Sequence, residues 1–177
     1  MAKILLLYST TDGHTLKICT RLQQVIERQA HQVTLAAVRD ARDIDLDRFD
    51  QIVIGASIRY GKHSPLVLDF VNRNAQLLDS KSNAFFTVNI VARKPEKNRP
   101  DTNPYMQKFL QQIAWRPKQL AVFAGKLDYP KYGFFDRLMI RFIMLMTDGP
   151  TDSKLVVEFT DWPQVEAFAQ SLAQIRC

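Results

Sequence analysis

Short apolar segments recur along this chain, and they limit its possible folds more than any other feature. Lys3 to Ser9 is almost uninterrupted in its apolar character. Comparable runs occur at 32–38, 51–56, 83–89 and 120–124. A short run without polar alternation is typical of a strand that is buried on both faces of a parallel sheet.

The segments between these runs have apolar residues at the spacing of an amphipathic helix. Helices are expected at 15–29, 66–78, 105–113 and, after a strand-like run at 155–159, at 162–175. Strands that alternate with helices predict an α/β fold with a doubly wound, five-stranded parallel sheet. Residues 126–154 follow the fifth strand and are not required by the alternation, so we expect an insertion within one domain that spans 1–177.

The loop after the first strand, from Ser9 to Thr15, combines hydroxyl groups, a glycine and the start of a helix. Backbone N–H groups at a helix start attract anions, and Gly13 permits a turn that gathers them around one ligand. The loop predicts either a phosphate site or an ordinary helix cap. A Walker A loop and a dinucleotide fingerprint are excluded, because neither Gly-Lys-Ser/Thr nor Gly-x-Gly-x-x-Gly is present.

Two further loops lie at the carboxyl ends of predicted strands, where doubly wound sheets bind their ligands. Gly55 to Gly61 places an Arg and a Tyr between two glycines, and Asn89 to Lys94 follows the next strand. A phosphate loop and two loops that flank a flat ring predict a site for flavin mononucleotide (FMN). A receiver domain shares this topology but needs an Asp near Ser57, which this chain lacks.

The residues expected to contact FMN come from these three loops. They are Thr10, Thr11, Asp12, Gly13, His14, Thr15, Ser57, Ile58, Arg59, Tyr60, Gly61, Asn89, Ile90, Val91 and Ala92. For His14 we expect only the backbone N–H to take part, although its ring is a candidate phosphate ligand or acid–base group. No metal site is expected, because His31 and His63 have no ligand-like spacing.

The motifs also resemble known families. Thr10 to Thr15 is similar to the flavodoxin phosphate loop, although flavodoxins usually have Thr at the position of Asp12. The Asp-containing form resembles the quinone-dependent protoporphyrinogen IX dehydrogenases. That resemblance covers nearly the whole chain and continues through IGASIRYG (54–61), VARKPEK (91–97), WRP (115–117) and TDW (160–162).

The resemblance implies a flavodoxin-like fold that holds FMN. It also implies oxidation of protoporphyrinogen IX to protoporphyrin IX in heme biosynthesis, with ubiquinone or menaquinone as the acceptor. Because the flavin carries the chemistry, no catalytic side chain is assigned. The porphyrinogen has two propionates, so cations near the ring are expected to bind it. The expected substrate-binding residues are Arg59, Arg93, Lys94 and Lys97.

The positive charge is concentrated in one window. Residues 93–141 contain 11 basic and 4 acidic residues, a net +7 that exceeds the +6 of the whole chain. Such a region attracts carboxylates, phosphates or anionic lipid. Nucleic acid is not expected as a partner, because no recognised nucleic-acid module is present.

The insertion contains an unusually apolar helix, predicted over 134–146. At about 20 Å it is too short to cross a hydrocarbon core of about 30 Å. One interpretation is that it is buried, in the core or between subunits of a homo-oligomer. Another is that it lies in a membrane interface with its Arg pair near the headgroups. Both interpretations can hold together, with part of the helix packed and part exposed. The expected membrane-facing residues are Phe134, Arg137, Arg141, Phe142, Ile143 and Leu145. The resemblance favours a peripheral position on the cytoplasmic face of the cell membrane, because a quinone is lipid-soluble.

Two other classes of function remain open from the sequence. One is a flavodoxin-type electron carrier or an NAD(P)H:quinone reductase, although such carriers are generally acidic and this chain has a net charge of +6. The other is a membrane-surface adaptor without enzymatic activity that has kept the fold and lost the flavin. A test of FMN binding distinguishes the adaptor, which would not bind it, from the dehydrogenase and from the carrier or quinone reductase.

Overall fold

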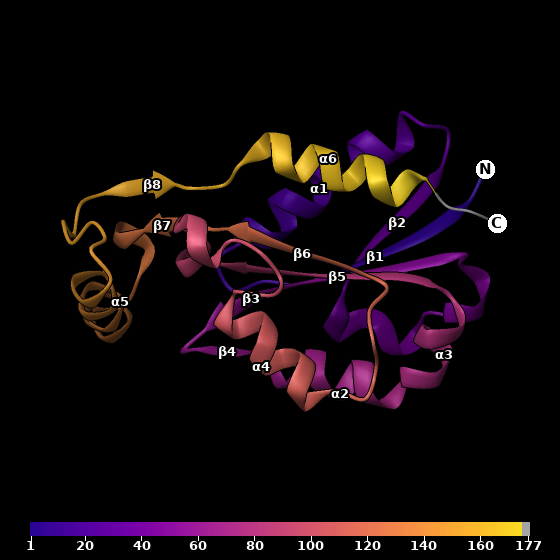
Figure 1. Ribbon diagram of the computed structural model, residues 1–177, viewed down its shortest axis with the longest axis horizontal. Coiled ribbons are helices and arrows are strands. Elements are labelled where there is room, and N and C mark those ends of the chain that lie inside the picture. Colours follow the sequence, from indigo (N-terminus) through magenta and orange to yellow (C-terminus); the bar gives the residue numbers. More distant parts are fainter. Residues whose placement is uncertain (175–177) are drawn as a thin grey trace.

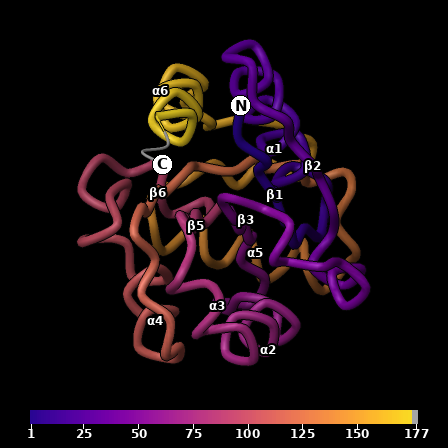
Figure 2. The backbone as a smooth tube through the Cα atoms, turned by 90° about the vertical axis from the view of Figure 1, so that its right-hand side faces the viewer, coloured from indigo at the N-terminus to yellow at the C-terminus, as the bar shows by residue number. Residues whose placement is uncertain are grey.

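The five apolar runs form one parallel sheet in the computed structural model, which describes residues 1–174. The strand order is β2-β1-β3-β5-β6, and each neighbouring pair is parallel. Their bounds are β1 (Lys3–Ser9), β2 (Gln32–Ala37), β3 (Gln51–Arg59), β5 (Ser82–Asn89) and β6 (Gln119–Ala124). Figure 2 shows the strands side by side in this order, which confirms the predicted fold class.

Helices cover both faces of the sheet. Figure 1 shows α1 (His14–Glu27) and α6 (Trp162–Ala173) above it, and α2 (Pro65–Arg73), α3 (Ala75–Ser80) and α4 (Pro104–Gln112) below it. The helix expected at 66–78 is divided at Asn74, whose side-chain amide donates to the Phe70 carbonyl at 2.8 Å. Ile175, the last residue of the predicted C-terminal helix, lies outside the described residues.

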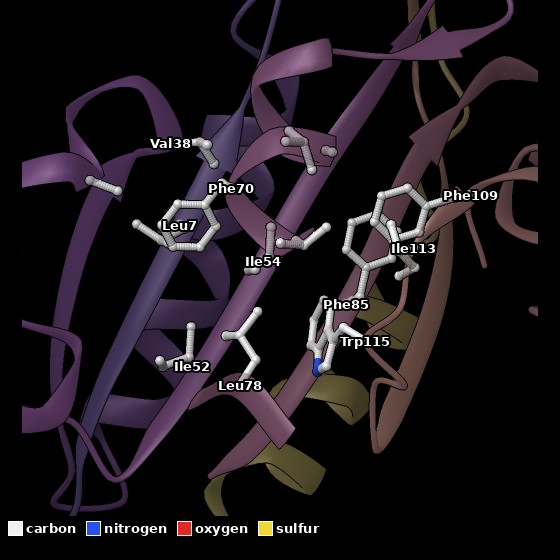
Figure 3. Packing of buried hydrophobic residues seen from close by; sticks show 14 of the residues in the cluster. Leu7, Val38, Ile52, Ile54, Phe70, Leu78, Phe85, Phe109, Ile113 and Trp115 are labelled. Atoms are coloured by element: carbon white, nitrogen blue, oxygen red, sulfur yellow. The ribbon is translucent and has the colours of Figure 1, made fainter. Parts of the chain in front are cut away.

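The core consists of one apolar layer on each face of the sheet. On the lower face, Phe85 of β5 stacks on Phe109 of α4 with ring centroids 4.0 Å apart, beside the buried ring of Trp115 (Figure 3). On the upper face, Gly55 admits the ring of Phe86, since a Cβ at residue 55 would lie 2.1 Å from that ring. The middle strand is therefore packed tightly on both sides, as its apolar sequence requires.

The remaining elements are short. The antiparallel strand β4 (Lys62–His63) pairs with the end of β3, so the sheet has an additional antiparallel edge there. The 3₁₀ helices in the described residues are η1 (Val38–Asp43), η2 (Leu46–Arg48), η3 (Ile90–Arg93), η4 (Pro95–Lys97) and η5 (Tyr129–Lys131).

The segment after β6 projects beyond the carboxyl ends of the strands (Figure 1). It contains β7 (Lys126–Asp128), η5, α5 (Phe134–Met146) and β8 (Val156–Glu158). β7 and β8 form a separate antiparallel pair, so the predicted strand at 155–159 does not join the main sheet. A small apolar core of Leu127, Tyr129, Tyr132 and Met144 stabilises the segment after β6. In the described part of the chain, no helix has both the length and the apolar character needed to span a bilayer.

His63 of β4 is buried beneath the loops at this edge of the sheet. Its Nε2 lies 2.9 Å from Thr87 Oγ1, and its ring packs against Phe85 and Phe109. Burial lowers the pKa of His63 to about 4, because the apolar surroundings disfavour the charged imidazolium.

We expect His63 to make the protein less stable in mild acid. Its unfolded-state pKa is about 6.5, so between that value and about 4 the unfolded chain binds the extra proton and the folded chain does not. The contribution of neutral His63 to the free energy of unfolding is complete above pH 6.5. It is lost as the pH falls from 6.5 to 4, by about 3 kcal/mol in all. Urea unfolding of wild type and His63→Gln from pH 7.5 to 4 measures the difference. Parallel pH dependences of the two proteins would contradict the assignment.

Candidate functional site

A cavity of about 350 Å³ lies at the carboxyl ends of β1, β3 and β5. The strand order reverses between β1 and β3, so the cavity occupies the position where doubly wound sheets bind ligands. Three of its walls are the predicted loops, through Thr10–Thr15, Ser57–Gly61 and Asn89–Val91. The fourth wall is formed by the insertion.

The first loop presents an open helix start to the cavity. Gly13 adopts a φ of 84° and precedes α1, and no side chain within residues 1–174 caps the helix. Thr10 Oγ1 accepts a hydrogen bond from the Gly13 N–H at 3.0 Å, which closes the loop. The hydroxyl of Thr15 is fully buried and has no partner among the described residues. A buried hydroxyl without a partner is costly, so this loop fits an anionic group that would accept from it.

The second loop is a tight hairpin between β3 and β4. Its central residues, Tyr60 and Gly61, have φ values of 49° and 71°, the pattern of a type I′ turn. Tyr60 is 59% exposed in this left-handed turn, and it lines the cavity. An aromatic face there can pack against a flat ring.

Arg59 connects this hairpin to the first loop and to the insertion. Its guanidinium bonds to Asp136 in the first turn of α5 and lies 3.5 Å from Asp12. The Tyr60 hydroxyl bonds to the same Asp136 carboxylate. Two carboxylates therefore share one guanidinium, and Asp12, the residue that departs from the flavodoxin loop, is partly neutralised.

The third loop is held by a buried amide pair. Asn89 Oδ1 accepts from the Ala92 N–H at 3.0 Å and from Asn103 Nδ2 at 3.2 Å. Asn103 also donates to the Lys97 carbonyl at 2.8 Å and caps α4. Because these groups are satisfied inside the protein, the loop backbone has a defined path along the cavity.

The cations predicted in the third loop lie outside the cavity lining. Arg93 donates to the Thr147 carbonyl at 2.7 Å and to the Ile90 carbonyl at 3.2 Å, so its guanidinium holds the C-terminal end of α5. Lys94 and Lys97 are also absent from the lining, and Ala92 is buried behind it. Among the predicted substrate-binding residues in the described chain, Arg59 alone lines the cavity.

His14 uses its ring in a structural contact. Thr160 Oγ1 donates to the Ala124 carbonyl at 2.8 Å, so it must accept from His14 Nε2, which lies 2.6 Å away. This assigns the proton of the neutral ring to Nε2. Burial lowers the pKa of His14 below its ordinary value. The negative charge of Glu158 opposes this shift, and the positive charges of Lys17 and Lys126 lower the pKa further. The neutral ring joins the start of α1 to the segment that leads into α6.

The insertion supplies cavity residues that the sequence interpretation missed. They are Lys126, Asp128, Lys131, Tyr132, Asp136, Met139, Ile140, Ile143 and Met144. The spacing of Met139, Ile140 and Ile143 indicates a shared helix face but does not say what that face contacts. For the polar residues, the spacing of Lys126 and Asp128, two positions apart in a short strand, indicates that both side chains point to the same side of that strand.

The predicted membrane-facing residues divide between two faces of α5. Phe134, Phe142 and Leu145 are 76%, 62% and 70% exposed, and Arg141 is exposed. Arg137 is partly buried and donates to the Tyr132 carbonyl at 3.2 Å, while Ile143 packs on the insertion core and lines the cavity. Four further large apolar side chains are exposed on this helix: Phe135, Leu138, Met139 and Met146.

Comparison with known proteins gives consistent results. Residues 5–154 match the flavodoxin domain family. Protoporphyrinogen IX dehydrogenase [quinone] of Escherichia coli K12 is 44% identical over 173 residues, which are 98% of this chain and 96% of that protein. The protein of the same name in Leishmania major is 42% identical over 174 residues, covering 98% of this chain and 75% of its own length.

Solved flavodoxin structures share the fold at low sequence identity. Oxidised flavodoxin 1 from Bacillus cereus has a TM-score of 0.56 at 14% identity and covers 99% of this chain and 100% of its own. Two-electron reduced flavodoxin from Megasphaera elsdenii has a TM-score of 0.56 at 13% identity, with coverages of 97% and 99%. These neighbours support the fold, and the match to the flavodoxin domain family indicates a flavin as the class of cofactor.

Proposed function

This chain belongs to the quinone-dependent protoporphyrinogen IX dehydrogenases, oxidoreductases built on a flavodoxin domain, and we propose that it uses FMN to oxidise protoporphyrinogen IX to protoporphyrin IX in heme biosynthesis. The electron acceptor is a membrane quinone, ubiquinone or menaquinone. One observation carries the proposal. The cavity joins an uncapped helix start with an unpartnered hydroxyl to an apolar wall from α5.

The first loop would hold the FMN phosphate. The amides at the start of α1 and the Thr15 hydroxyl supply donors, and Gly13 provides the turn. Arg59 reduces the repulsion between Asp12 and a neighbouring phosphate, because the two side chains form an ion pair. This explains how the loop can carry an acidic residue next to an anion.

The other two loops would flank the flavin ring, through Ser57–Gly61 and Asn89–Val91. When bound, FMN supplies two-electron acceptance from the porphyrinogen and two-electron donation to the quinone. The chain's own residues position the reactants. Tyr60 presents an aromatic face, the Asn89–Asn103 pair holds the loop backbone, and Met139, Ile140 and Ile143 provide a wall that excludes water.

The exposed face of α5 would contact an anionic membrane surface. Six large apolar side chains of α5 are exposed outside the cavity lining, and the window at 93–141 has a net charge of +7. A short helix with an apolar face and nearby cations is typical of interfacial binding. The quinone is dissolved in the same lipid, so a peripheral position on the cytoplasmic face of the cell membrane brings the cavity wall close to the acceptor.

The test of the function is an anaerobic assay of the FMN-loaded protein with protoporphyrinogen IX and a soluble ubiquinone or menaquinone analogue. We expect porphyrin fluorescence that depends on the quinone. One porphyrinogen gives up six electrons and six protons, so three quinones should be converted to quinols for each porphyrin formed.

Other outcomes of this assay favour the alternatives. Quinone reduction that requires NAD(P)H and proceeds without porphyrinogen would indicate a quinone reductase. A flavin that exchanges electrons with redox proteins only would indicate a carrier. A protein that does not bind FMN would indicate an adaptor.

Thr15→Val should change the flavin-free and the flavin-loaded protein in opposite directions. In the free protein it removes a buried hydroxyl without a partner, which should raise the free energy of unfolding by about 1 kcal/mol. In the loaded protein it removes a donor to phosphate, so the Kd for FMN should rise about 3- to 30-fold. Thr20→Val is the matched control, because Thr20 lies on the exposed side of α1 and donates to the Leu16 carbonyl. Flavin fluorescence titration and urea unfolding measure both effects, and unchanged FMN affinity would contradict the phosphate assignment.

Replacing Phe135, Phe142 and Leu145 by Ser should weaken membrane binding at least 10-fold. Each large apolar side chain contributes about 1.5–3 kcal/mol when fully buried, and partial insertion gives a fraction of that. Sedimentation with vesicles of phosphatidylglycerol and phosphatidylethanolamine measures the change. Leu66→Ser, at a 50% exposed site on α2, is the control and should bind normally. Retained FMN binding shows that the triple variant is folded, and unchanged sedimentation of that folded variant would exclude this face.

A further inference from the structure

The cations that line the cavity differ in how fully they are neutralised. Lys17 pairs with Glu158 at 2.8 Å, and Arg59 has two carboxylates, Asp12 and Asp136. The remaining two cavity cations come from the insertion, Lys126 from β7 and Lys131 from η5.

Lys126 and Lys131 share a single carboxylate. Their Nζ atoms lie 3.3 and 3.6 Å from the same oxygen, Asp128 Oδ2. The Asp128 side chain is only 11% exposed, whereas Lys126 and Lys131 are 31% and 65% exposed. The cluster therefore has a net charge of +1, with a mostly buried carboxylate and two more exposed lysine side chains among the residues that line the cavity. Such a cluster can accept a further anion.

The neighbouring wall is apolar. Met139, Ile140, Ile143 and Met144 of α5 line the same cavity, and Met144 also belongs to the insertion core. The cavity thus places two ammonium groups beside a flexible hydrophobic surface. Protoporphyrinogen IX has the same division, because its two propionates occupy one edge of the macrocycle and its methyl and vinyl groups occupy the rest.

We propose that Lys126 and Lys131, held together by Asp128, bind the two propionates of the substrate, while the α5 wall packs against the vinyl-bearing edge. This inference rests on the proposed function. The residues proposed to bind the carboxylates are therefore in the insertion and not in the loop at 93–97. Arg93 is occupied with the end of α5, and Lys94 and Lys97 lie outside the lining. Asp128 is then a positioning residue that keeps two like charges close together.

The experiment measures binding of protoporphyrin IX to the FMN-loaded protein by fluorescence in a mild detergent. The variants are Lys126→Gln, Lys131→Gln and the double variant. Lys154→Gln is the control, because Lys154 is exposed in the same insertion and lies outside the cavity. Protoporphyrin IX is tested in two forms, as the free dicarboxylate and as the dimethyl ester, which has the same macrocycle without the charges.

We expect each single variant to weaken binding of the dicarboxylate about 3- to 10-fold and the double variant more than 10-fold. Binding of the dimethyl ester should change less than about 2-fold, and Lys131→Arg should restore most of the affinity. The difference between wild type and the double variant should shrink at high salt, because the lysines are partly exposed.

Several results would overturn the proposal. Equal weakening for the diacid and the ester would mean that the lysines only support the fold of the insertion. Loss of FMN from the variants would assign the lysines to the cofactor phosphate. A wild-type protein that binds no porphyrin would also exclude the site. Lysine-dependent binding of the diacid without turnover of protoporphyrinogen would instead keep the site and reject the proposed function.

Discussion

Burial of both faces of the five-stranded sheet is the constraint on which the rest of the structure depends. The middle strands have no solvated face, so their polar residues are displaced to the strand ends, and the loops there must carry the binding groups. The close fit of Gly55 against Phe86 and the stacking of Phe85 on Phe109 hold the strands that carry these loops. Because the sheet is rigid, three loops that are distant in sequence meet at one cavity.

The insertion uses this rigid edge as its support. Asp136 bonds to Arg59 and Tyr60, and Arg93 holds the other end of α5, so the helix is attached at both termini to loops of the main sheet. Little of its apolar surface is used in this attachment, since Met144 is its one fully buried side chain. One face of α5 therefore forms part of the cavity wall, and the other is exposed.

The electrostatics follow a similar division of roles. Cations that face a carboxylate one to one, such as Lys17, hold segments together, and cations in surplus, such as Lys126 and Lys131, are left for a ligand. The net charge of the window at 93–141 does not distinguish these roles. Arg93 and Lys131 contribute equally to that charge, yet Arg93 binds the carbonyl of Thr147 at the end of α5, whereas Lys131 lines the cavity.

The strands, most helices, the parallel topology and the three loops at the carboxyl edge could be predicted from the amino-acid sequence, because each depends on local periodicity and on turn residues such as Gly13 and Gly61. The sequence also contained the motifs that identify the family. Three features could not be predicted and depend on how distant segments pack. They are the side chains of the insertion that reach the cavity, the sharing of Arg59 by Asp12 and Asp136, and the hydrogen bond between the His14 ring and Thr160. These contacts join residues 47 to 146 positions apart, and no local pattern specifies the direction of an inserted helix relative to a sheet that precedes it in the chain.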